Sequence, residues 1–256
     1  MHSTQKLTSR ENPNIKRWIS LHESKGIKKN AQFLVFGKTA VDEILQKQPD
    51  KCLELIHSTN SNAPSSVPSH IINYEIPHDL FLTLDLFGTH HSLLVCQSTQ
   101  ILACDLNSSP TQLEVLCPLG DPANVGALLR SCAGFGLKRF VLLKECANPL
   151  LPKSIRSCAG GIFDIQLFTG PAIDDLINIE DLMVLDMDGT SLEAVSWPKN
   201  ARLLVGEEGP GIASRKFKNK IKIPLSNYTD SLNATVAASI AIYDYRKQHP
   251  IKGSKP

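Results

Sequence analysis

The sequence predicts an α/β protein whose larger part is a parallel sheet with helices packed on both faces. Between residues 112 and 248, short apolar segments alternate with amphipathic stretches, as the strands and crossover helices of a parallel sheet do. Several apolar segments also run directly into loops rich in glycine or polar residues. In an open parallel sheet such loops lie at the carboxyl edge, which is where ligands bind.

The chain of 256 residues is long enough for two domains of ordinary size. A polar, turn-rich segment at residues 105–110 separates two halves whose segments differ in length and order. We therefore expect a small mixed α/β domain over residues 1–108 and the parallel-sheet domain over residues 109–256.

The elements of the first half follow from apolar spacing. Ile15, Trp18 and Ile19 recur at helical spacing after the turn-prone Asn12-Pro13, which predicts a first helix. A buried strand is expected at residues 31–37, and an amphipathic helix follows it. Further strands are expected at residues 52–58, 70–75 and 92–97, with a loop rich in Ser, Asn and Pro at 59–69.

The second half alternates more regularly. Strands are expected at residues 112–120, 138–144, 164–168, 181–189, 201–209 and 220–225. Helices are expected at about residues 122–136, 151–158 and 231–248.

Composition excludes several classes of protein. Hydrophobic residues make up 42% and charged residues 20% of the chain, as in soluble globular proteins. No apolar run reaches the roughly 18 residues of a membrane span, and the N-terminus has no apolar core of a secretory signal. The seven scattered cysteines form no C-x-x-C pair, so we expect reduced thiols in a cytoplasmic protein and no metal site.

The net charge of +2 is unevenly distributed. Residues 1–30 contain seven Lys or Arg against two Glu, and residues 215–222 contain five basic residues in eight. Such clusters attract polyanions. Either cluster taken alone is also typical of a solvated surface.

The first of three chemically suggestive loops spans residues 120–131. Pro122 suits the first turn of a helix, and Asn124 would lie on that turn near free backbone donors. Arg130 would reach the same end of the sheet only by leaning back toward the helix N-terminus, the direction in which helical side chains tilt. The alternative for Arg130 is a surface ion pair.

The second loop spans residues 203–211 and contains three glycines, at 206, 209 and 211. Glycine permits unusual backbone torsions and close approach of a ligand to the main chain. The segment is neither a P-loop nor a G-x-G-x-x-G motif. On its own it fits many nucleotide-binding folds and many plain turns.

The third loop spans residues 223–238 and leads into the last helix. Asp230 or Ser231 is expected to cap that helix, which would place Asn233 in its first turn. Ala234, Ala237, Ala238 and Ala241 form a small-residue face. This face would admit a second helix at close range, or pack in the ordinary way on the sheet.

Taken together, in this order and spacing, the three segments resemble the motifs of the SpoU branch of the SPOUT methyltransferases. That family's patterns are N-x-G-x-x-x-R, G-x-E-G-x-G and an I-P segment followed by S-L-N, and all three are complete here. The resemblance covers about residues 112–248. The first half resembles the ribosomal-protein-like RNA-binding domain that often precedes SpoU domains.

The resemblance implies a trefoil knot at the C-terminal end of the sheet, an exception to the rule against threaded chains. It also implies that S-adenosylmethionine lies in the knot, held largely by backbone groups. The matching cofactor positions are Leu185, Asp186, Gly189, Val205, Gly206, Gly209, Gly211, Ile223, Leu225, Leu232 and Ala234.

The family's polar catalytic set corresponds to Asn124, Arg130, Glu208, Ser231 and Asn233. A ribose hydroxyl is a poor nucleophile that must be aligned with the sulfonium methyl and lose its proton. An arginine stays protonated in proteins. We therefore expect Arg130 to bind the adjacent phosphate and stabilise developing alkoxide charge, while Asn124 and Glu208 orient it and Ser231 and Asn233 position the substrate and the knot.

RNA contacts are expected mainly in the first domain. The candidates are Lys16, Arg17, Lys28, Lys29 and Arg156, which would add salt-dependent affinity without sequence choice. For Arg156 a structural ion pair is the alternative. Cys158 stands where the family commonly has Ser, so no catalytic role is assigned to it. The family is homodimeric, and its usual interface includes the last helix with its Ala face.

The sequence therefore predicts a SAM-dependent RNA 2′-O-methyltransferase that acts on structured RNA. The full first domain favours rRNA over tRNA. The alternatives are an RNA-binding protein of this fold without methyl transfer, a base methyltransferase of the N1-methylguanosine branch, and a Rossmann-type nucleotide enzyme. The last is disfavoured because no G-x-G-x-x-G opens a βαβ unit.

Overall fold

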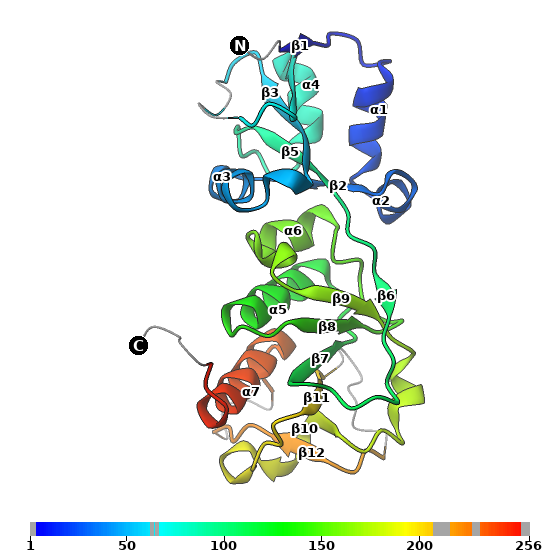
Figure 1. Ribbon diagram of the computed structural model, residues 1–256, viewed down its shortest axis with the longest axis vertical. Helices are drawn as coiled ribbons and strands as arrows, with labels where there is room; N and C mark the ends of the chain where they lie inside the picture. The colour runs from blue at the N-terminus through cyan, green and yellow to red at the C-terminus, as the bar shows by residue number, and fades with distance from the viewer. Residues whose placement is uncertain (1–3, 62–63, 65–66, 207–215, 227–230, 252–256) are drawn as a thin grey trace. The chain divides into compact units, whose positions relative to one another are not determined.

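The computed structural model describes residues 4–61, 64, 67–206, 216–226 and 231–251. The chain divides into two compact units, residues 1–100 with 148–160 and residues 101–147 with 161–256 (Figure 1). This division differs from the expected boundary after residue 108. Strand β6 (Leu102–Ala103) pairs with β9 (Gln166–Thr169) and so belongs to the second sheet. Residues 148–160, which include α6 (Pro152–Cys158), cluster with the first unit.

The first unit is built on a mixed five-stranded sheet in the order β1-β4-β3-β5-β2. Pairing is parallel for β1–β4 and β3–β4 and antiparallel for β3–β5 and β2–β5. The strands are β1 (Gln5–Lys6), β2 (Gln32–Val35), β3 (Cys52–Ser58), β4 (Ile72–Ile76) and β5 (Leu93–Gln97). The helices, besides α6, are α1 (Pro13–Ser20), α2 (Ser24–Asn30), α3 (Lys38–Lys47), the 3₁₀ turn η1 (Pro49–Lys51) and α4 (His78–Leu84).

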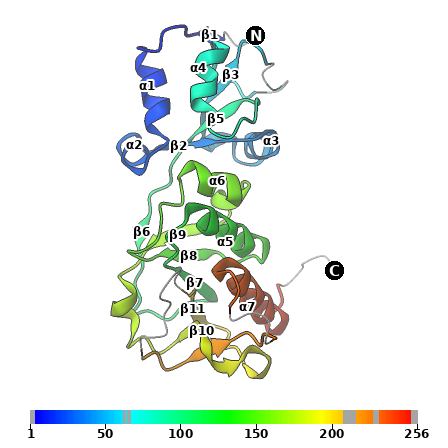
Figure 2. The same ribbon diagram turned by 180° about the vertical axis from the view of Figure 1, so that it is seen from behind.

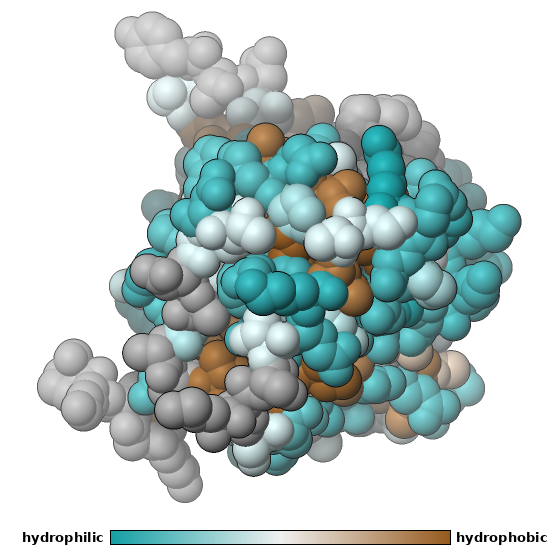
Figure 3. Space-filling view, turned by 90° about the horizontal axis from the view of Figure 1, so that it is seen from above, coloured by the Kyte–Doolittle hydropathy of each residue, from teal (hydrophilic) through white to brown (hydrophobic). Residues whose placement is uncertain are grey.

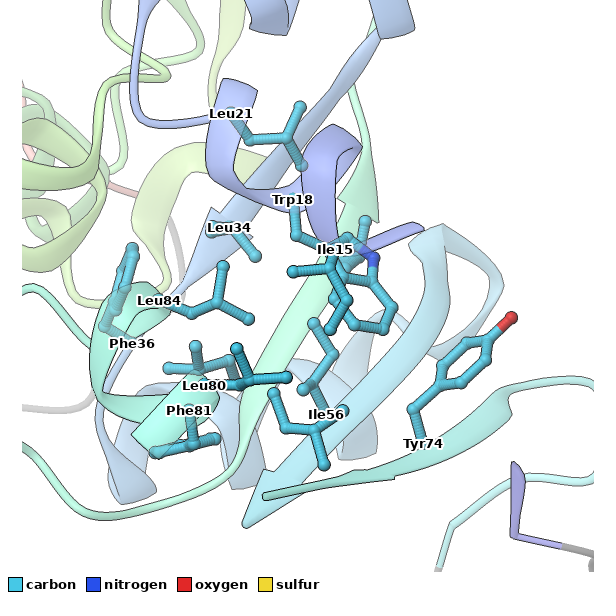
Figure 4. Packing of buried hydrophobic residues seen from close by; sticks show 13 residues of the cluster. Ile15, Trp18, Leu21, Leu34, Phe36, Ile56, Tyr74, Leu80, Phe81 and Leu84 are labelled. Carbon is cyan, nitrogen blue, oxygen red and sulfur yellow. The ribbon is translucent and has the colours of Figure 1, made fainter. Parts of the chain in front are cut away.

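The core of this unit forms where α1 and α4 pack on the sheet (Figure 4). Helix α1 begins where the Asn12 side chain accepts a hydrogen bond from the Asn14 N–H, as an N-cap does. Its buried residues Ile15 and Trp18 then face the sheet. Leu80 and Phe81 of α4 belong to the same cluster. The helical spacing around Trp18 therefore predicted a real buried face.

The second unit is built on a seven-stranded sheet in the order β12-β10-β11-β7-β8-β9-β6, and every pairing in it is parallel. The remaining strands are β7 (Leu113–Cys117), β8 (Arg139–Leu142), β10 (Leu182–Ser191), β11 (Ala201–Leu204) and β12 (Lys220–Lys222). All residues of β7 and β11 are buried, as expected for the centre of a covered parallel sheet.

The two faces of this sheet are covered differently. Helices α5 (Pro122–Gly134) and α7 (Ala234–Gln248) lie side by side on one face (Figures 1 and 2). A second core cluster packs sheet residues such as Val141 and Leu204 against Ile173 and Leu176 of the 3₁₀ turn η3 (Ile173–Leu176). Two further short turns are η2 (Gly161–Phe163) and η4 (Leu192–Ala194). This corrects the expectation of helices on both faces. Within the described residues, the second cluster is covered by the short turn η3 and by loop residues.

The start of α7 and its Ala face also differ from expectation. Asn233 is the N-cap, because its side chain accepts hydrogen bonds from the N–H groups of Thr235 and Val236, and the helix begins at Ala234. The expectation that Asn233 lies in the first turn is therefore wrong. Ala238 and Ala241 are fully buried within the chain. They are not an exposed face for another subunit.

The surface has no unusual apolar character in the view from above. The face seen in Figure 3 is mostly hydrophilic, with small hydrophobic patches between polar side chains. Scattered apolar exposure of this kind is normal for a folded protein.

Candidate active site at the carboxyl edge of the parallel sheet

The first and second motif segments follow neighbouring parallel strands. The Val205 N–H, just after β11, donates to the Leu116 carbonyl of β7 at 3.1 Å. A Cβ placed on Gly206 would lie 3.5 Å from the carbonyl oxygen of Leu185, which lies inside β10. The ends of β7 and β11 are therefore adjacent, and the loops that follow them share one edge of the sheet.

The first and third motifs are joined by hydrogen bonds. The Asn233 side-chain amide donates to the Asn124 side-chain oxygen at 3.4 Å, and the Thr235 hydroxyl donates to the Asn124 carbonyl at 3.2 Å. Asn124 itself is fixed by Asp121, the N-cap of α5, which accepts from the Asn124 N–H at 3.0 Å. The expectation that Asn124 and Asn233 belong to one site is consistent with this contact.

Helices α5 and α7 hold that contact in place. The hydroxyls of Ser131 and Ser239 are 2.8 Å apart, and the Arg246 guanidinium donates to the Phe135 carbonyl at 2.7 Å. These contacts along both helices thus fix the position of one helix N-terminus relative to the other, and Asn124 and Asn233 lie at these N-termini.

The segment after Leu185 forms a bulge at the edge of β10. Ile221 of β12 is the register partner of both Leu185 and Thr190, so residues 186–189 are looped out between two pairings. The Asp186 carboxylate closes the bulge by accepting from the Met187 N–H at 2.7 Å, and the Lys220 ammonium lies 2.6 Å from it.

The charge on Asp186 is stabilised despite its burial. Its side chain is only 4% exposed, and burial alone would raise the pKa of the carboxyl. The hydrogen bonds from Lys220, the Asp188 N–H and the Met187 N–H outweigh burial and hold the pKa of Asp186 below its usual value. Asp186 therefore shapes the bulge through its carboxylate.

Gly189 is required by the close passage of two chain segments. Its φ is +141°, and an added Cβ would lie 2.4 Å from the Lys220 carbonyl oxygen. No other residue fits without moving the β12 backbone. The role of Gly189 in holding the cofactor stays a prediction.

The remaining expected cofactor residues are placed as follows. Leu185 and Val205 are buried; Ile223, Leu232 and Ala234 are half-buried; and Leu225 is exposed. Gly209 and Gly211, together with the expected catalytic Glu208, lie outside the described residues.

Arg130 and Ser231 are exposed. Arg130 lies on α5, and within the described part of the chain no hydrogen bond or ion pair connects its guanidinium to Asn124 or Asn233. The structure therefore unites two members of the expected catalytic set, Asn124 and Asn233. The role of Arg130 stays a prediction.

Among the expected RNA contacts, Lys28 and Lys29 are exposed on the last turn of α2. Lys16 is exposed and pairs with Glu11. The Arg156 guanidinium lies over the Phe87 ring, 4.4 Å from its centroid.

Arg17 is held differently from the other candidates. One nitrogen of its guanidinium, Nη2, donates to both carboxylate oxygens of Glu54 at 2.8 and 2.9 Å, and its side chain is 20% exposed. The Trp18 indole donates to the same carboxylate at 2.7 Å. This geometry favours a structural role for Arg17 rather than a phosphate contact.

Sequence reasoning missed two residues of the site. Asp121 caps α5, and its place directly before Pro122 is a recognisable N-cap signal. Lys220 pairs with Asp186 across 34 positions of sequence. No local pattern could have revealed that pairing.

No group of His, Cys, Asp or Glu suited to a metal ion occurs among the described residues. The seven cysteines all lie in the described part of the chain, and no disulfide joins any of them there. Across the described ranges, no helix is both long and apolar enough to span a membrane.

Two curated relatives match nearly the whole chain. The chain is 34% identical over 248 residues to the ribosomal RNA small subunit methyltransferase G 2 of Syntrophobacter fumaroxidans, covering 96% of this chain but about half of that longer protein (50%). It is 26% identical to the 23S rRNA (guanosine(2553)-2′-O)-methyltransferase RlmP of Bacillus subtilis, covering 94% of this chain and 99% of the relative.

Solved structures share the fold. An AdoMet-bound rRNA methyltransferase from Sinorhizobium meliloti superposes with a TM-score of 0.77 at 19% identity, covering 97% of this chain and 99% of that one. The SpoU methyltransferase AviRb from Streptomyces viridochromogenes, in complex with AdoMet, superposes with a TM-score of 0.76 at 18% identity, covering 93% and 98%. The α/β fold with its parallel sheet is thus that of SpoU methyltransferase structures.

The family model described as the SpoU rRNA Methylase family matches residues 113–243. This range includes β7, α5, the bulge within β10 and most of α7. Because it covers more than half of the 256 residues, the chain belongs to the SpoU rRNA Methylase family.

Proposed function

We propose that the protein transfers the methyl group of S-adenosylmethionine to a ribose 2′-hydroxyl of ribosomal RNA. The observation that carries the proposal is the contact between Asn124 and Asn233, near the adjacent ends of β7 and β11. Two relatives that match most of the chain are named as rRNA methyltransferases, one of them for 2′-O transfer.

The residues at this edge fit the cofactor. Among the described residues, a Cβ on Gly120 would meet nothing within 4 Å, and one on Gly206 would meet only the Leu185 carbonyl oxygen at 3.5 Å. The described side chains therefore leave space beside the ends of β7 and β11. Met187 and Leu225 are 62% and 38% exposed, and such apolar side chains suit a ligand with both apolar and polar parts.

When bound, the cofactor supplies an electrophilic methyl group on a sulfonium. Asn124 and Asn233 are proposed to orient the loops that bring the ribose to that methyl, since alignment of reacting atoms lowers the barrier strongly. Arg130 is proposed to bind the adjacent phosphate and stabilise negative charge as it develops on the 2′-oxygen. The proton leaves through phosphate or water.

The role of Arg130 has its own test. Replacement by Lys keeps the charge but removes the planar fork that binds a phosphate in two places. We expect Arg130→Lys to lower kcat about 10- to 100-fold while SAM still binds. Near-normal turnover would mean that no specific guanidinium contact is needed.

Three further features are proposals for this chain. The trefoil knot is supported by the bulge of β10 against β12 and by Gly189, which lets the two segments pass closely. RNA binding by the first unit is supported by exposed Lys28 and Lys29. A homodimer is supported by exposed apolar residues on α7, namely Val236, Ile240 and Tyr243.

The proposed function is tested by transfer of labelled methyl from SAM to unmodified rRNA and tRNA, followed by nucleoside analysis. We expect label in a 2′-O-methylnucleoside of rRNA. Label on a base would overturn ribose transfer and keep the enzyme class. SAM binding without transfer to either RNA would contradict the choice of substrate, and absence of SAM binding would favour an RNA-binding protein without methyl transfer.

A further inference from the structure

A row of lysines runs through the segment that leads into β12 (Lys220–Lys222), the outermost strand of the second sheet, and along that strand. Lys216, Lys218, Lys220 and Lys222 alternate with other residues, of which Phe217 and Ile221 are buried, 7% and 1% exposed. Lys216, Lys218 and Lys222 are exposed and are called here the edge lysines. No ion pair joins any edge lysine to a carboxylate among the described residues.

The row concentrates charge in a nearly neutral protein. The chain carries a net charge of +2, and residues 216–222 contain four lysines and no acidic residue. The rest of the chain is therefore net negative. Together with residues 1–30, which contain seven Lys or Arg against two Glu, the row is one of two cationic segments of the sequence, and such a segment attracts a polyanion.

The row also leads to the proposed methyl-transfer site. Strand β12 is the edge strand of the sheet and pairs only with β10. Its one partly buried lysine, Lys220, is 19% exposed on its side chain and pairs with Asp186 in the bulge. The fourth lysine thus ties the row to the loop proposed to hold the cofactor, while the edge lysines stay available to an outside ligand.

Lysines on an edge strand also prevent strands of other molecules from pairing with it. One exposed lysine would suffice for a strand of three residues such as β12. Lys222 fills that role, whereas Lys216 and Lys218 lie before the strand and have no partner carboxylate among the described residues, so edge protection does not account for them. We propose that the edge lysines bind the phosphate backbone of the substrate RNA beside the methyl-transfer site; this proposal rests on the proposed function.

The test measures RNA binding as a function of salt. The probe is a fluorescein-labelled 20-nucleotide poly(U) RNA, and its anisotropy is followed with the full chain over a series of KCl concentrations. Each lost phosphate contact lowers the slope of log K against log salt by about 0.7 for a single strand. The triple variant Lys216→Gln, Lys218→Gln, Lys222→Gln is therefore expected to lower the slope by about 2.

Two matched variants keep the test specific. The first is a control triple, Lys138→Gln, Lys199→Gln and Lys247→Gln, which removes the same charge from three other exposed lysines. These lysines lie near the amino ends of β8 and β11 and near the end of α7. We expect the control triple to keep the wild-type slope. The triple Lys→Arg variant of the edge lysines keeps their charge, and we expect it to keep the wild-type slope.

The outcomes separate this proposal from the proposed function. If the triple Gln variant has the wild-type slope while the wild type still methylates RNA, the edge lysines do not bind RNA, and the proposed function stands. Equal losses in both Gln triples would also overturn the proposal, since net charge alone would explain them. Both the proposed function and this proposal are supported if the wild type binds SAM and methylates rRNA, and if the salt slope of probe binding falls in the triple Gln variant of the edge lysines but not in the control triple.

Discussion

At the scale of single residues, one ion pair connects distant parts of the sequence at the proposed cofactor loop. Asp186 accepts hydrogen bonds from its own loop and is paired with Lys220 at 2.6 Å. A hydrogen bond to a charged group contributes about 1.5–3 kcal/mol. The pair is therefore strong enough to fix the shape of the bulge at residues 186–189.

Replacing Lys220 by Met should weaken SAM binding about tenfold, because the bulge would lose a contact worth at least about 1.4 kcal/mol. Calorimetric titration of SAM measures the effect. Lys220→Arg is expected to restore most of the affinity. Lys222→Met, on the same strand but exposed, is the control and should bind SAM normally. Equal affinity of Lys220→Met and wild type would show that the ion pair has no part in forming the cofactor loop.

The same ion pair predicts a pH dependence of stability. The pKa of folded Asp186 is lowered because hydrogen bonds from Lys220 and the loop outweigh burial. Its contribution is therefore complete above the usual Asp pKa of about 3.9 and is lost as pH falls through the lower folded value. Urea unfolding at several pH values should show wild type more stable than Asp186→Asn at pH 7, with the difference shrinking below about pH 4. A constant difference would contradict the assignment.

Asn233 has two separable roles. Its side-chain oxygen caps α7, and its amide donates to Asn124. Asn233→Ala should lose about 1 kcal/mol of stability and lower kcat roughly 10- to 100-fold. Asn233→Asp keeps the cap and loses the donor, so we expect near-wild-type thermal stability with the same low kcat. Normal turnover by the Asp variant would exclude a role for the contact with Asn124.

At the scale of elements, a buried ion network joins the central strands of the second sheet. Glu114 of β7 is 2% exposed on its side chain and pairs with Arg202 of β11, at 3.1 Å, and with Arg139 of β8. Arg202 is equally buried and also pairs with Asp181 at 2.8 Å. The network fixes neighbouring strands side by side, and it depends on every member because an unpaired buried charge is costly.

Removing Arg202 should therefore destabilise the protein strongly. Arg202→Met leaves Glu114 with one partner, and we expect a loss of about 3–5 kcal/mol in the free energy of unfolding. Arg139 is 29% exposed on its side chain, so water can replace it and Arg139→Met should cost less. Chemical denaturation of both variants measures the difference. Equal and small losses would mean that Glu114 finds another partner or is protonated.

Apolar patterns predicted most elements of this protein, because burial decides where strands form. Each expected strand of the second half occurs, and the helix starting at Pro122 was visible from its proline. Helices α2 and α4 were missed because neither shows a helical period: α2 (SKGIKKN) contains a single large apolar residue, and α4 (HDLFLTL) contains a nearly continuous apolar run. The α7 cap was misplaced because several polar residues before the helix can cap it, and only backbone geometry selects Asn233.

The candidate site was predictable only in part. The resemblance to the SpoU motifs pointed to Asn124 and Asn233, whose side chains the structure brings within 3.4 Å of each other. The pairing of Asp186 with Lys220 is a tertiary contact with no local signature. The ion pair between Arg17 and Glu54 is likewise a tertiary contact without a local signature. The basic cluster was visible in the sequence, but the fold decides which of its members turns inward.

At the scale of the whole molecule, the two units are not two continuous stretches of chain. Residues 148–160 belong with the first unit although the segments before and after them belong to the second. The chain thus leaves the second unit after β8 and returns before β9. Truncation at residue 108 would separate α6 from its own unit, so experiments on this protein require the full chain.

The proposed homodimer is the last property of the whole molecule that can be tested. Val236, Ile240 and Tyr243 are 47%, 36% and 59% exposed, and their spacing places them on one face of α7. Contiguous exposed apolar residues of this kind mark interaction sites. We expect light scattering after gel filtration to give the mass of a dimer for the wild type.

Placing charge on this face should separate the subunits, because a charge buried at an interface without a partner is strongly unfavourable. Ile240→Glu with Tyr243→Glu is therefore expected to give a monomer of unchanged helix content. Leu82→Glu, at a residue 45% exposed on α4, is the control and should remain dimeric. A wild type that is monomeric at all concentrations would contradict the dimer itself. A double variant that stays dimeric would place the interface elsewhere than this face of α7.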